Sequence, residues 1–101
     1  MKNLFDIKNK VIVITGGCGI LGKNIANYLA EQGAKIVILD RVEEAGRELE
    51  AELNRKSEAL FLVTDVLNKE VLEENKKAIL ERFGTIDVLL NAAGGNLNQI
   101  L

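Results

Sequence analysis

Short apolar runs alternate along the chain with longer stretches in which apolar residues recur every three or four positions. The short runs are rich in β-branched residues and have the length of strands: 11–15, 35–40, 59–63 and 86–90. The longer stretches have the period of amphipathic helices: 20–32, 42–55 and 69–82. The pattern therefore predicts a strict alternation of strand and helix that begins and ends on a strand.

Each predicted helix carries one apolar stripe. The residues expected to face the core are Ile25, Ala26 and Leu29 in the first helix, Val42, Ala45, Gly46, Leu49 and Leu53 in the second, and Leu72, Ile79 and Phe83 in the third. Gly33 and Gly84 are suited to helix C-termini, and Asn68 is suited to the N-cap of the third helix. Tyr28, the only tyrosine, falls inside the first helix, where we expect it to pack.

The predicted strands are almost continuously apolar, as "VIVIT" and "KIVILD" illustrate. Strands of this kind are usually covered on both faces, as in parallel α/β sheets. We therefore predict an α/β fold, the first half of a three-layer, doubly wound Rossmann sheet with strand order 3-2-1-4. Right-handed crossovers would place the first two helices on one face and the third on the other. Part of that second face would then be bare, and the fourth strand would lie at an edge.

The stretch "TGGCGILG" (15–22) follows the first predicted strand and opens the first predicted helix. Gly17, Gly19 and Gly22 stand at G-x-G-x-x-G spacing, which in this context is typical of a dinucleotide phosphate cradle. A helix N-terminus offers N–H groups and a positive dipole, and glycine lets a pyrophosphate approach them. The alternative is a turn whose glycines serve only close packing. Cys18 is expected to be a small residue that fits the turn, although a helix N-terminus can acidify a thiol.

Asp40 ends the second predicted strand, 18 positions after Gly22, where a ribose-binding acid is expected. A carboxylate there can accept hydrogen bonds from both ribose hydroxyls and would repel a 2′-phosphate, so Asp40 favours NAD over NADP. Arg41 argues the other way, because an arginine can pair with a phosphate. The alternative role for Asp40 is a helix-capping acid, and both roles can hold together.

Composition narrows the function classes. The chain has 101 residues and a net charge of −2, which suits one domain and gives no electrostatic case for nucleic acid or an acidic membrane. No apolar run is long enough to cross a bilayer, and we expect no secretion signal. A single cysteine permits no internal disulfide and favours the cytoplasm. The absence of histidine removes the commonest general base and metal ligand, so no metal site is predicted.

Four motifs taken together, "TGGCGILG" (15–22), "LD" (39–40), "TDV" (64–66) and "LLNAAGG" (89–95), resemble the short-chain dehydrogenase/reductase family. The resemblance covers the whole chain. It implies an oxidoreductase that transfers a hydride between a nicotinamide cofactor and a hydroxyl or carbonyl carbon. The usual turn of that family is TG-x-x-x-G-x-G, whereas here Gly19 falls one position early and Ile20 stands where glycine is expected. This form is similar to sugar-acid or polyol oxidoreductases of the mannonate/fructuronate type.

The resemblance also implies cofactor contacts. Asp65 would accept a hydrogen bond from the adenine amine, and Val66 would pack beside the ring. Asn91 would tie down the end of the fourth strand, and the small residues after it would let a ribose lie against backbone. The full set implied is Thr15, Gly16, Gly17, Cys18, Gly19, Ile20, Leu21, Gly22, Asp40, Arg41, Asp65, Val66, Asn91, Ala92, Ala93 and Gly94.

The catalytic groups of the family are a serine and a Tyr-x-x-x-Lys pair, which the resemblance implies beyond Leu101, because Tyr28 is followed four positions later by Gln32. We therefore expect residues 1–101 to be the dinucleotide-binding part of an enzyme that acts on a small alcohol or carbonyl compound and is a homo-oligomer at full length. One alternative is a non-catalytic nucleotide-binding or interaction module that completes its sheet with a partner chain. Another is methyl transfer from S-adenosylmethionine, which leaves "NAAGG" unexplained.

Overall fold

The computed structural model describes residues 6–92, and Ala93 and Gly94 of the predicted cofactor set lie outside them. The elements follow in the predicted order: β1 (Val11–Thr15), α1 (Ile20–Glu31), β2 (Lys35–Asp40), α2 (Glu43–Asn54), β3 (Ala59–Val63), α3 (Lys69–Phe83) and β4 (Val88–Asn91). The three helices match their predicted ranges to within one residue at either end. No helix within residues 6–92 has the length and apolar character needed to cross a membrane.

The four strands form one parallel sheet in the order β3-β2-β1-β4, which confirms the predicted topology. The register aligns Thr15 with Leu39 on one side and with Asn91 on the other, and Asp40 with Val63. The carboxyl ends of all four strands therefore lie at the same end of the sheet. In open α/β sheets this is the end at which ligands bind.

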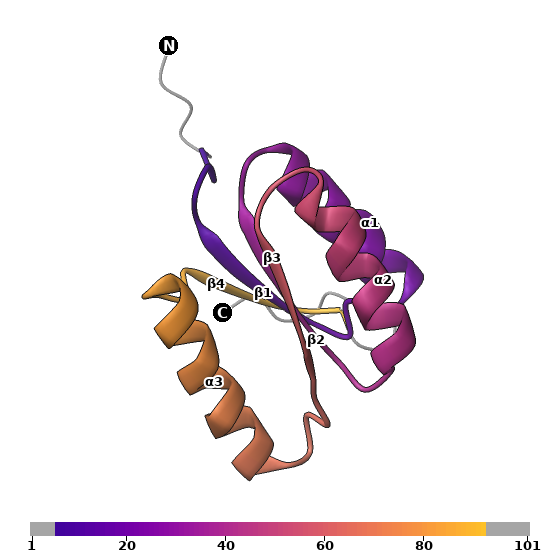
Figure 1. Cartoon of the computed structure of the whole chain (residues 1–101), viewed down its shortest axis with the longest axis vertical. Helices are drawn as coiled ribbons and strands as arrows, with labels where there is room; N and C mark the ends of the chain where they lie inside the picture. Colours follow the sequence, from indigo (N-terminus) through magenta and orange to yellow (C-terminus); the bar gives the residue numbers. More distant parts are fainter. Residues whose placement is uncertain (1–5, 93–101) are drawn as a thin grey trace.

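The helices lie on opposite faces of the sheet as predicted. Figure 1 shows α1 and α2 together on one side and α3 on the other. On the first side, Ile14, Ile38 and Phe61 of the strands form one buried cluster with Ala26 of α1 and Leu53 of α2. The small Ala26 side chain lets α1 approach the sheet closely, so this face is well covered.

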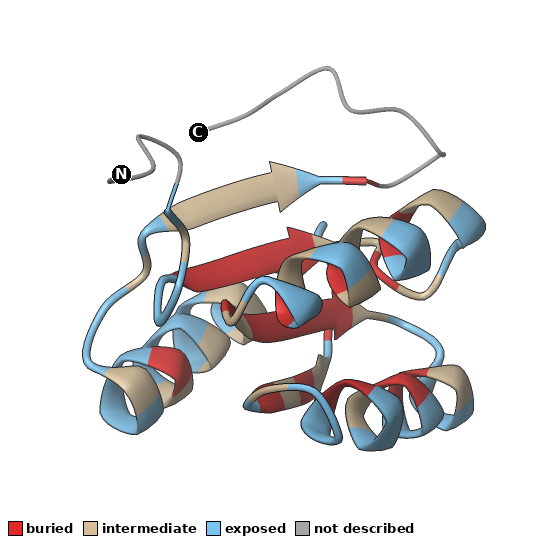
Figure 2. Cartoon of the chain, turned by 90° about the horizontal axis from the view of Figure 1, so that it is seen from above, coloured by how far each residue is buried: buried red, intermediate tan, exposed pale blue. Residues whose placement is uncertain are grey.

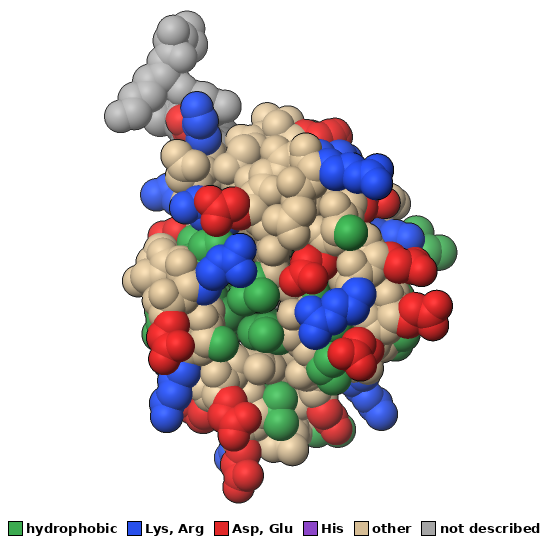
Figure 3. Space-filling view, viewed as in Figure 1, with side chains coloured by type: hydrophobic (Ala, Val, Ile, Leu, Met, Phe, Trp, Pro, Cys, Tyr) green, Lys and Arg blue, Asp and Glu red, His purple; other side chains and the backbone are tan. Residues whose placement is uncertain are grey.

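In the part of the chain that the structure describes, α3 is the one helix on the second face. Val13, Val37 and Leu39 pack there with Ile79, the one residue that α3, described over its whole length, buries. Leu62 on the same face is only half-buried. Figure 3 shows hydrophobic side chains gathered between α3 and β3 on the visible face of the molecule. This is the partly bare apolar surface that the strand order predicts.

The fourth strand begins later than predicted, at Val88 rather than at residue 86, and ends one residue later, at Asn91. Asp87 explains the late start. Its Oδ2 accepts a hydrogen bond from the Val11 N–H at 2.8 Å, while its own N–H donates to the Val11 oxygen at 2.9 Å. Regular pairing therefore starts only with Val88 and Ile12. Figure 2 shows β4 as a half-buried strand beside the buried β1.

Two predictions about helix faces are wrong. Val42 was expected on the apolar stripe of α2 but is 54% exposed, because it is the N-cap residue and its extended backbone (φ −92°, ψ 99°) places it outside the helix. Tyr28 was expected to pack but is 62% exposed. It lies about 200° around α1 from the buried Ala26, at 100° per residue.

The predicted helix ends are confirmed. The Asn68 Oδ1 accepts hydrogen bonds from the N–H groups of Glu70 at 3.0 Å and Val71 at 3.2 Å, which caps α3. Gly84, after α3, has a φ of 82°, and Gly33, after α1, has a φ of 91°. Both lie in the left-handed region that favours glycine, so each helix stops where the sequence indicates.

Candidate functional site

The turn between β1 and α1, residues 15–22, is held by close backbone contacts. Gly16 has a φ of 68° and donates its N–H to the Leu39 oxygen at 2.8 Å, which ties the turn to β2. A Cβ on Gly22 would lie 2.7 Å from both the Gly16 oxygen and the Gly17 Cα. Because these are backbone atoms, a side chain at position 22 would force the turn apart. Gly22 therefore serves the packing role that was the alternative explanation for the glycines.

Gly19 is different. Its backbone (φ −73°, ψ 169°) is one that any residue can adopt. A Cβ there would meet the Gly16 oxygen at 3.7 Å, an ordinary contact. Neither conformation nor packing within residues 6–92 requires glycine at this position. Gly19 instead lines the cavity in front of the turn, so the missing side chain leaves room for a ligand there.

The N-terminus of α1 lies at the same cavity and has no side-chain cap. Gly19, Ile20 and Leu21 all line the cavity, and the first turn of α1 holds no acidic residue. In contrast, α2 has two glutamates in its first turn, and α3 is capped by Asn68. The N–H groups and the positive dipole at the start of α1 can therefore receive an anionic group.

The Asp40 carboxylate joins the glycine turn to the start of α2. Its Oδ2 accepts a hydrogen bond from the Cys18 N–H at 3.0 Å, and its Oδ1 accepts from the N–H groups of Arg41 at 2.6 Å and Val42 at 3.2 Å. The N-cap residue of α2 is Val42, and α2 has no side-chain cap hydrogen bond, so the helix-capping role considered for Asp40 is not observed; its bonds hold the turn that precedes the helix. Asp40 also lines the cavity. Its Oδ1 already accepts two backbone hydrogen bonds and its Oδ2 accepts one, so Oδ2 can accept a further bond from a ligand while the turn stays in place.

The cavity has a volume of about 710 Å³, within the usual size of small-molecule sites, and lies at the carboxyl end of the sheet. It combines the glycine turn with the ends of β2, β3 and β4. The lining residues are Gly16, Gly19, Ile20, Leu21, Asn24, Leu39, Asp40, Arg41, Thr64, Val66 and Ala92. Segments that are distant in the sequence therefore share one binding volume.

Several predicted site residues do not line the cavity. Thr15, Gly17, Cys18 and Gly22 are not among the lining residues. Thr15 Oγ1 donates to Asn91 Oδ1 at 3.1 Å, a contact that links the ends of β1 and β4. These residues shape the turn and the strand ends that carry the lining groups.

Asp65 lies outside the main cavity, although its neighbour Val66 lines it. The Asp65 side chain is exposed, and its Oδ1 accepts a hydrogen bond from the Leu67 N–H at 2.9 Å. It borders a separate, smaller cavity with Asn68. The predicted contact of Asp65 with adenine stays a prediction.

Three lining residues were not predicted: Asn24, Leu39 and Thr64. Thr64 is 1% exposed, and its Oγ1 donates to the Leu62 oxygen at 2.9 Å and accepts from Asn75 Nδ2 at 2.7 Å. The sequence contained an indication for two of these residues. Thr64 is the polar residue that ends the apolar run "ALFLV", and Asn24 lies one helical turn after Ile20.

Cys18 does not have the acidic thiol that a helix N-terminus can produce. Burial raises the pKa of its thiol to about 11, and the Asp40 carboxylate adds to the rise through its charge and a hydrogen bond. Lys23 acts in the opposite direction but does not outweigh them. The thiol is therefore protonated at neutral pH, which leaves it a poor nucleophile.

The geometry agrees with a comparison of the sequence with known families. The family model described as short chain dehydrogenase matches residues 10–100. This chain belongs to the short-chain dehydrogenase family. The match extends from the start of β1 past the end of β4, so it includes the glycine turn and the acid after β2. Family membership removes the methyl-transfer alternative.

Members of this family with similar sequences include several oxidoreductases. An uncharacterised oxidoreductase, UxuB, from Bacillus subtilis is 40% identical over 92 residues, which are 90% of this chain and 33% of the relative. The structure of a candidate D-mannonate oxidoreductase from Haemophilus influenzae with bound NAD is 38% identical with a TM-score of 0.84, and the match covers 92% of this chain and 34% of that one.

L-sorbose reductase from Gluconobacter frateurii, solved with NADPH and L-sorbose, is 33% identical with a TM-score of 0.81. That match covers 87% of this chain and 34% of the reductase. The short-chain dehydrogenase chain described here therefore spans about a third of the length of these three relatives.

Proposed function

We propose that this chain is the nucleotide-binding part of an NAD-dependent oxidoreductase that transfers a hydride between nicotinamide and a hydroxyl or carbonyl carbon. The observation that supports it best is that the uncapped start of α1, the glycine turn and Asp40 border one cavity. Doubly wound sheets bind dinucleotides at this end. The cofactor, when bound, supplies the group that accepts or donates the hydride.

Each wall of the cavity suits a different part of a dinucleotide. The N–H groups at the start of α1 would hold the pyrophosphate, in the space that Gly19 leaves. Asp40 would accept hydrogen bonds from the hydroxyls of the adenosine ribose. Val66 would pack beside adenine, with Asp65 as the acceptor for its amine. Ala92 would let the second ribose lie close to the backbone at the end of β4.

We further propose NAD rather than NADP as the cofactor. Asp40 lies in the cavity wall, where its negative charge would oppose a 2′-phosphate. Arg41 lines the same cavity and could pair with that phosphate, but its own N–H is bonded to Asp40, which keeps the carboxylate beside it. Among the similar structures, the D-mannonate oxidoreductase candidate binds NAD and the sorbose reductase binds NADPH, so kinship alone leaves the choice open.

The substrate class that we propose is a polyhydroxylated compound, a sugar acid or polyol. It rests on the "TGGCGILG" form of the turn and on the kinship with a D-mannonate oxidoreductase candidate, L-sorbose reductase and a xylitol dehydrogenase. The catalytic serine, tyrosine and lysine would lie outside these 101 residues, and the whole enzyme would be a homo-oligomer. Oxidation of a panel of sugar acids, polyols and simple alcohols by the complete natural protein would test the class.

The cofactor proposal is tested by Asp40→Ala in the complete natural protein. We expect the Kd of NAD to rise by about tenfold to a hundredfold, since hydrogen bonds to a charged group contribute roughly 1.5–3 kcal/mol each. The Kd of NADP should stay the same or fall. Isothermal titration of both cofactors measures this, and Arg41→Ala, at the adjacent lining position, is the matched control.

The two roles of Asp40 give different results in this experiment. If Asp40 only holds the turn through Cys18 and Val42, the affinities for NAD and NADP should fall together. If it contacts the ribose hydroxyls, NAD alone should lose affinity. An unchanged NAD affinity would remove Asp40 from the proposed site.

A further inference from the structure

The outer edge of β3 carries an arrangement of side chains that the cofactor site does not explain. β3 is the last strand of the order β3-β2-β1-β4, so among residues 6–92 no strand lies on one side of its backbone. An open edge of this kind presents N–H and C=O groups that can pair with a strand of another molecule. Another strand can therefore pair at this edge only if these N–H and C=O groups are not already bonded.

The pairing pattern identifies the outward backbone groups. The Ile36 N–H donates to the Glu58 oxygen at 3.0 Å, and the Thr64 N–H donates to the Asp40 oxygen at 2.8 Å. Residues 58 and 64 therefore direct these groups toward β2. Since successive residues of a strand alternate, the N–H groups of Ala59 and Phe61 point away from β2, to the outer edge.

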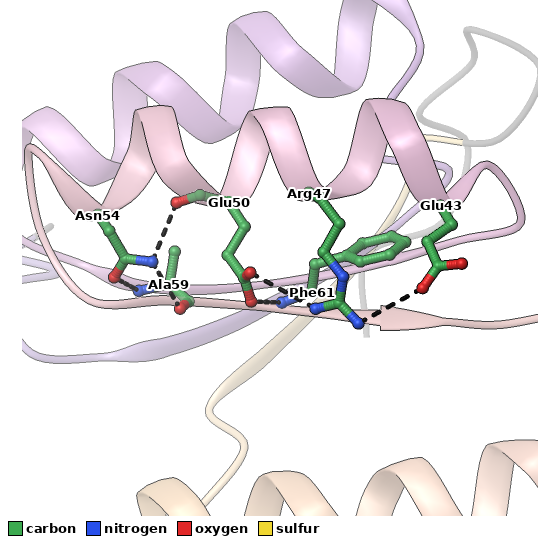
Figure 4. Close-up of polar contacts among 6 residues, drawn as sticks. All are labelled: Glu43, Arg47, Glu50, Asn54, Ala59 and Phe61. Carbon is green, nitrogen blue, oxygen red and sulfur yellow. Dashed lines mark hydrogen bonds and ion pairs between the residues drawn. The ribbon is translucent and has the colours of Figure 1, made fainter.

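Two side chains of α2 occupy these outward groups, as Figure 4 shows. Asn54 bonds both sides of one residue: its Oδ1 accepts from the Ala59 N–H at 2.9 Å, and its Nδ2 donates to the Ala59 oxygen at 3.2 Å. Glu50 Oε2 accepts from the Phe61 N–H at 2.7 Å. Asn54 thus offers the same donor and acceptor that a paired strand would offer, and Glu50 offers the next acceptor.

The surrounding residues keep these side chains in place. Arg47 Nη1 lies 3.5 Å from Glu50 Oε1, its Nη2 lies 3.7 Å from Glu43, and its guanidinium lies 5.3 Å from the centre of the Phe61 ring. Gly46 allows α2 to approach, because a Cβ there would be 2.1 Å from Phe61 Cε1. The short distance between α2 and β3 is what lets the side chains reach the strand backbone.

We propose that Glu50 and Asn54 replace a neighbouring strand and thereby keep the outer edge of β3 from pairing with a strand of a second copy of this protein. Two polar side chains of a helix that packs on the face of the sheet extend over its edge and satisfy the backbone there. These bonds close the part of the β3 edge at Ala59 and Phe61 without a covering strand. Their loss exposes a parallel-sheet edge that also carries the half-buried Leu60 and Leu62.

The test uses the complete natural protein with Glu50→Ala and Asn54→Ala combined. We expect the mass measured by light scattering to rise with concentration above that of the wild type. Amide exchange of Ala59 and Phe61 at low concentration should accelerate about tenfold, the factor that corresponds to loss of one net hydrogen bond. Glu48→Ala removes the same charge from an exposed position of α2 and should change neither quantity.

Conservative variants keep the test decisive if the double variant does not fold. Glu50→Gln retains an acceptor oxygen and should preserve both the mass and the slow exchange of Phe61. Asn54→Ala alone should accelerate exchange at Ala59 but not at Phe61. If a folded Asn54→Ala or double variant keeps the wild-type mass at all concentrations and the wild-type exchange rates, the side chains do not seal the edge and the proposal is overturned.

Discussion

At the scale of single residues, the pKa of the Cys18 thiol reflects its surroundings in the glycine turn. Burial and the Asp40 carboxylate raise its pKa to about 11, so at pH 8 the thiolate fraction should be roughly 100-fold lower than that of an unfolded chain. Alkylation of Cys18 by iodoacetamide, followed by peptide mass spectrometry, should therefore be slow at pH 8. The rate should increase up to about pH 11.

The Asp40→Asn variant is the control for the cause of this shift. It removes the charge of the Asp40 carboxylate, the second largest cause of the raised pKa, and leaves one amide oxygen where the carboxylate has two acceptor oxygens. The alkylation profile should move to lower pH in this variant, but not fully to that of the unfolded protein, because burial remains. A wild-type profile centred below pH 9 would show instead that the helix N-terminus dominates.

At the scale of elements, the contact between α2 and β3 depends on Gly46. Its Cβ position is 2.1 Å from Phe61 Cε1, and Phe61 is fully buried, so Gly46→Ala must displace either the ring or the helix. Overpacking of this kind costs about 1–3 kcal/mol, more than the roughly 1 kcal/mol that alanine gains over glycine in a helix. We expect a lower midpoint in urea unfolding, whereas Glu48→Ala on the exposed face of α2 should be close to neutral. An unchanged midpoint in Gly46→Ala would mean that α2 shifts freely over β3.

At the scale of the whole molecule, the helices bury more residues against one face of the sheet than against the other. α1 and α2 share a large buried cluster, whereas α3 contributes Ile79 as its one buried residue among those described. Ile79→Ala should destabilise the protein by about 2–5 kcal/mol and should accelerate amide exchange in α3 more than in α1. Leu80→Ala, one position along and 39% exposed, is the matched control. Equal acceleration in all three helices would indicate that the protein opens as a single unit.

The accuracy of sequence reasoning differs between the elements and the site. β1, β2 and β3 have the predicted bounds because each is a compact apolar run between turn residues. β4 was misplaced because Asp87 forms a bond with Val11, 76 positions earlier, which no local pattern indicates. Val42 and Tyr28 were misassigned for a related reason. Apolar character alone does not show on which side of a helix boundary, or of a helix, a residue lies.

By itself the sequence determined the order of elements, the parallel sheet and the family, because these follow from local periodicity, crossover handedness and motif spacing. Tertiary structure alone decided which groups meet at the cavity: Asn24, Leu39 and Thr64 belong to it, and Asp65 does not. It also decided that Glu50 and Asn54 reach the edge of β3. The physical reason is distance. Periodicity reports which face of an element is buried, whereas contacts between side chains and backbone of different elements depend on how closely those elements pack.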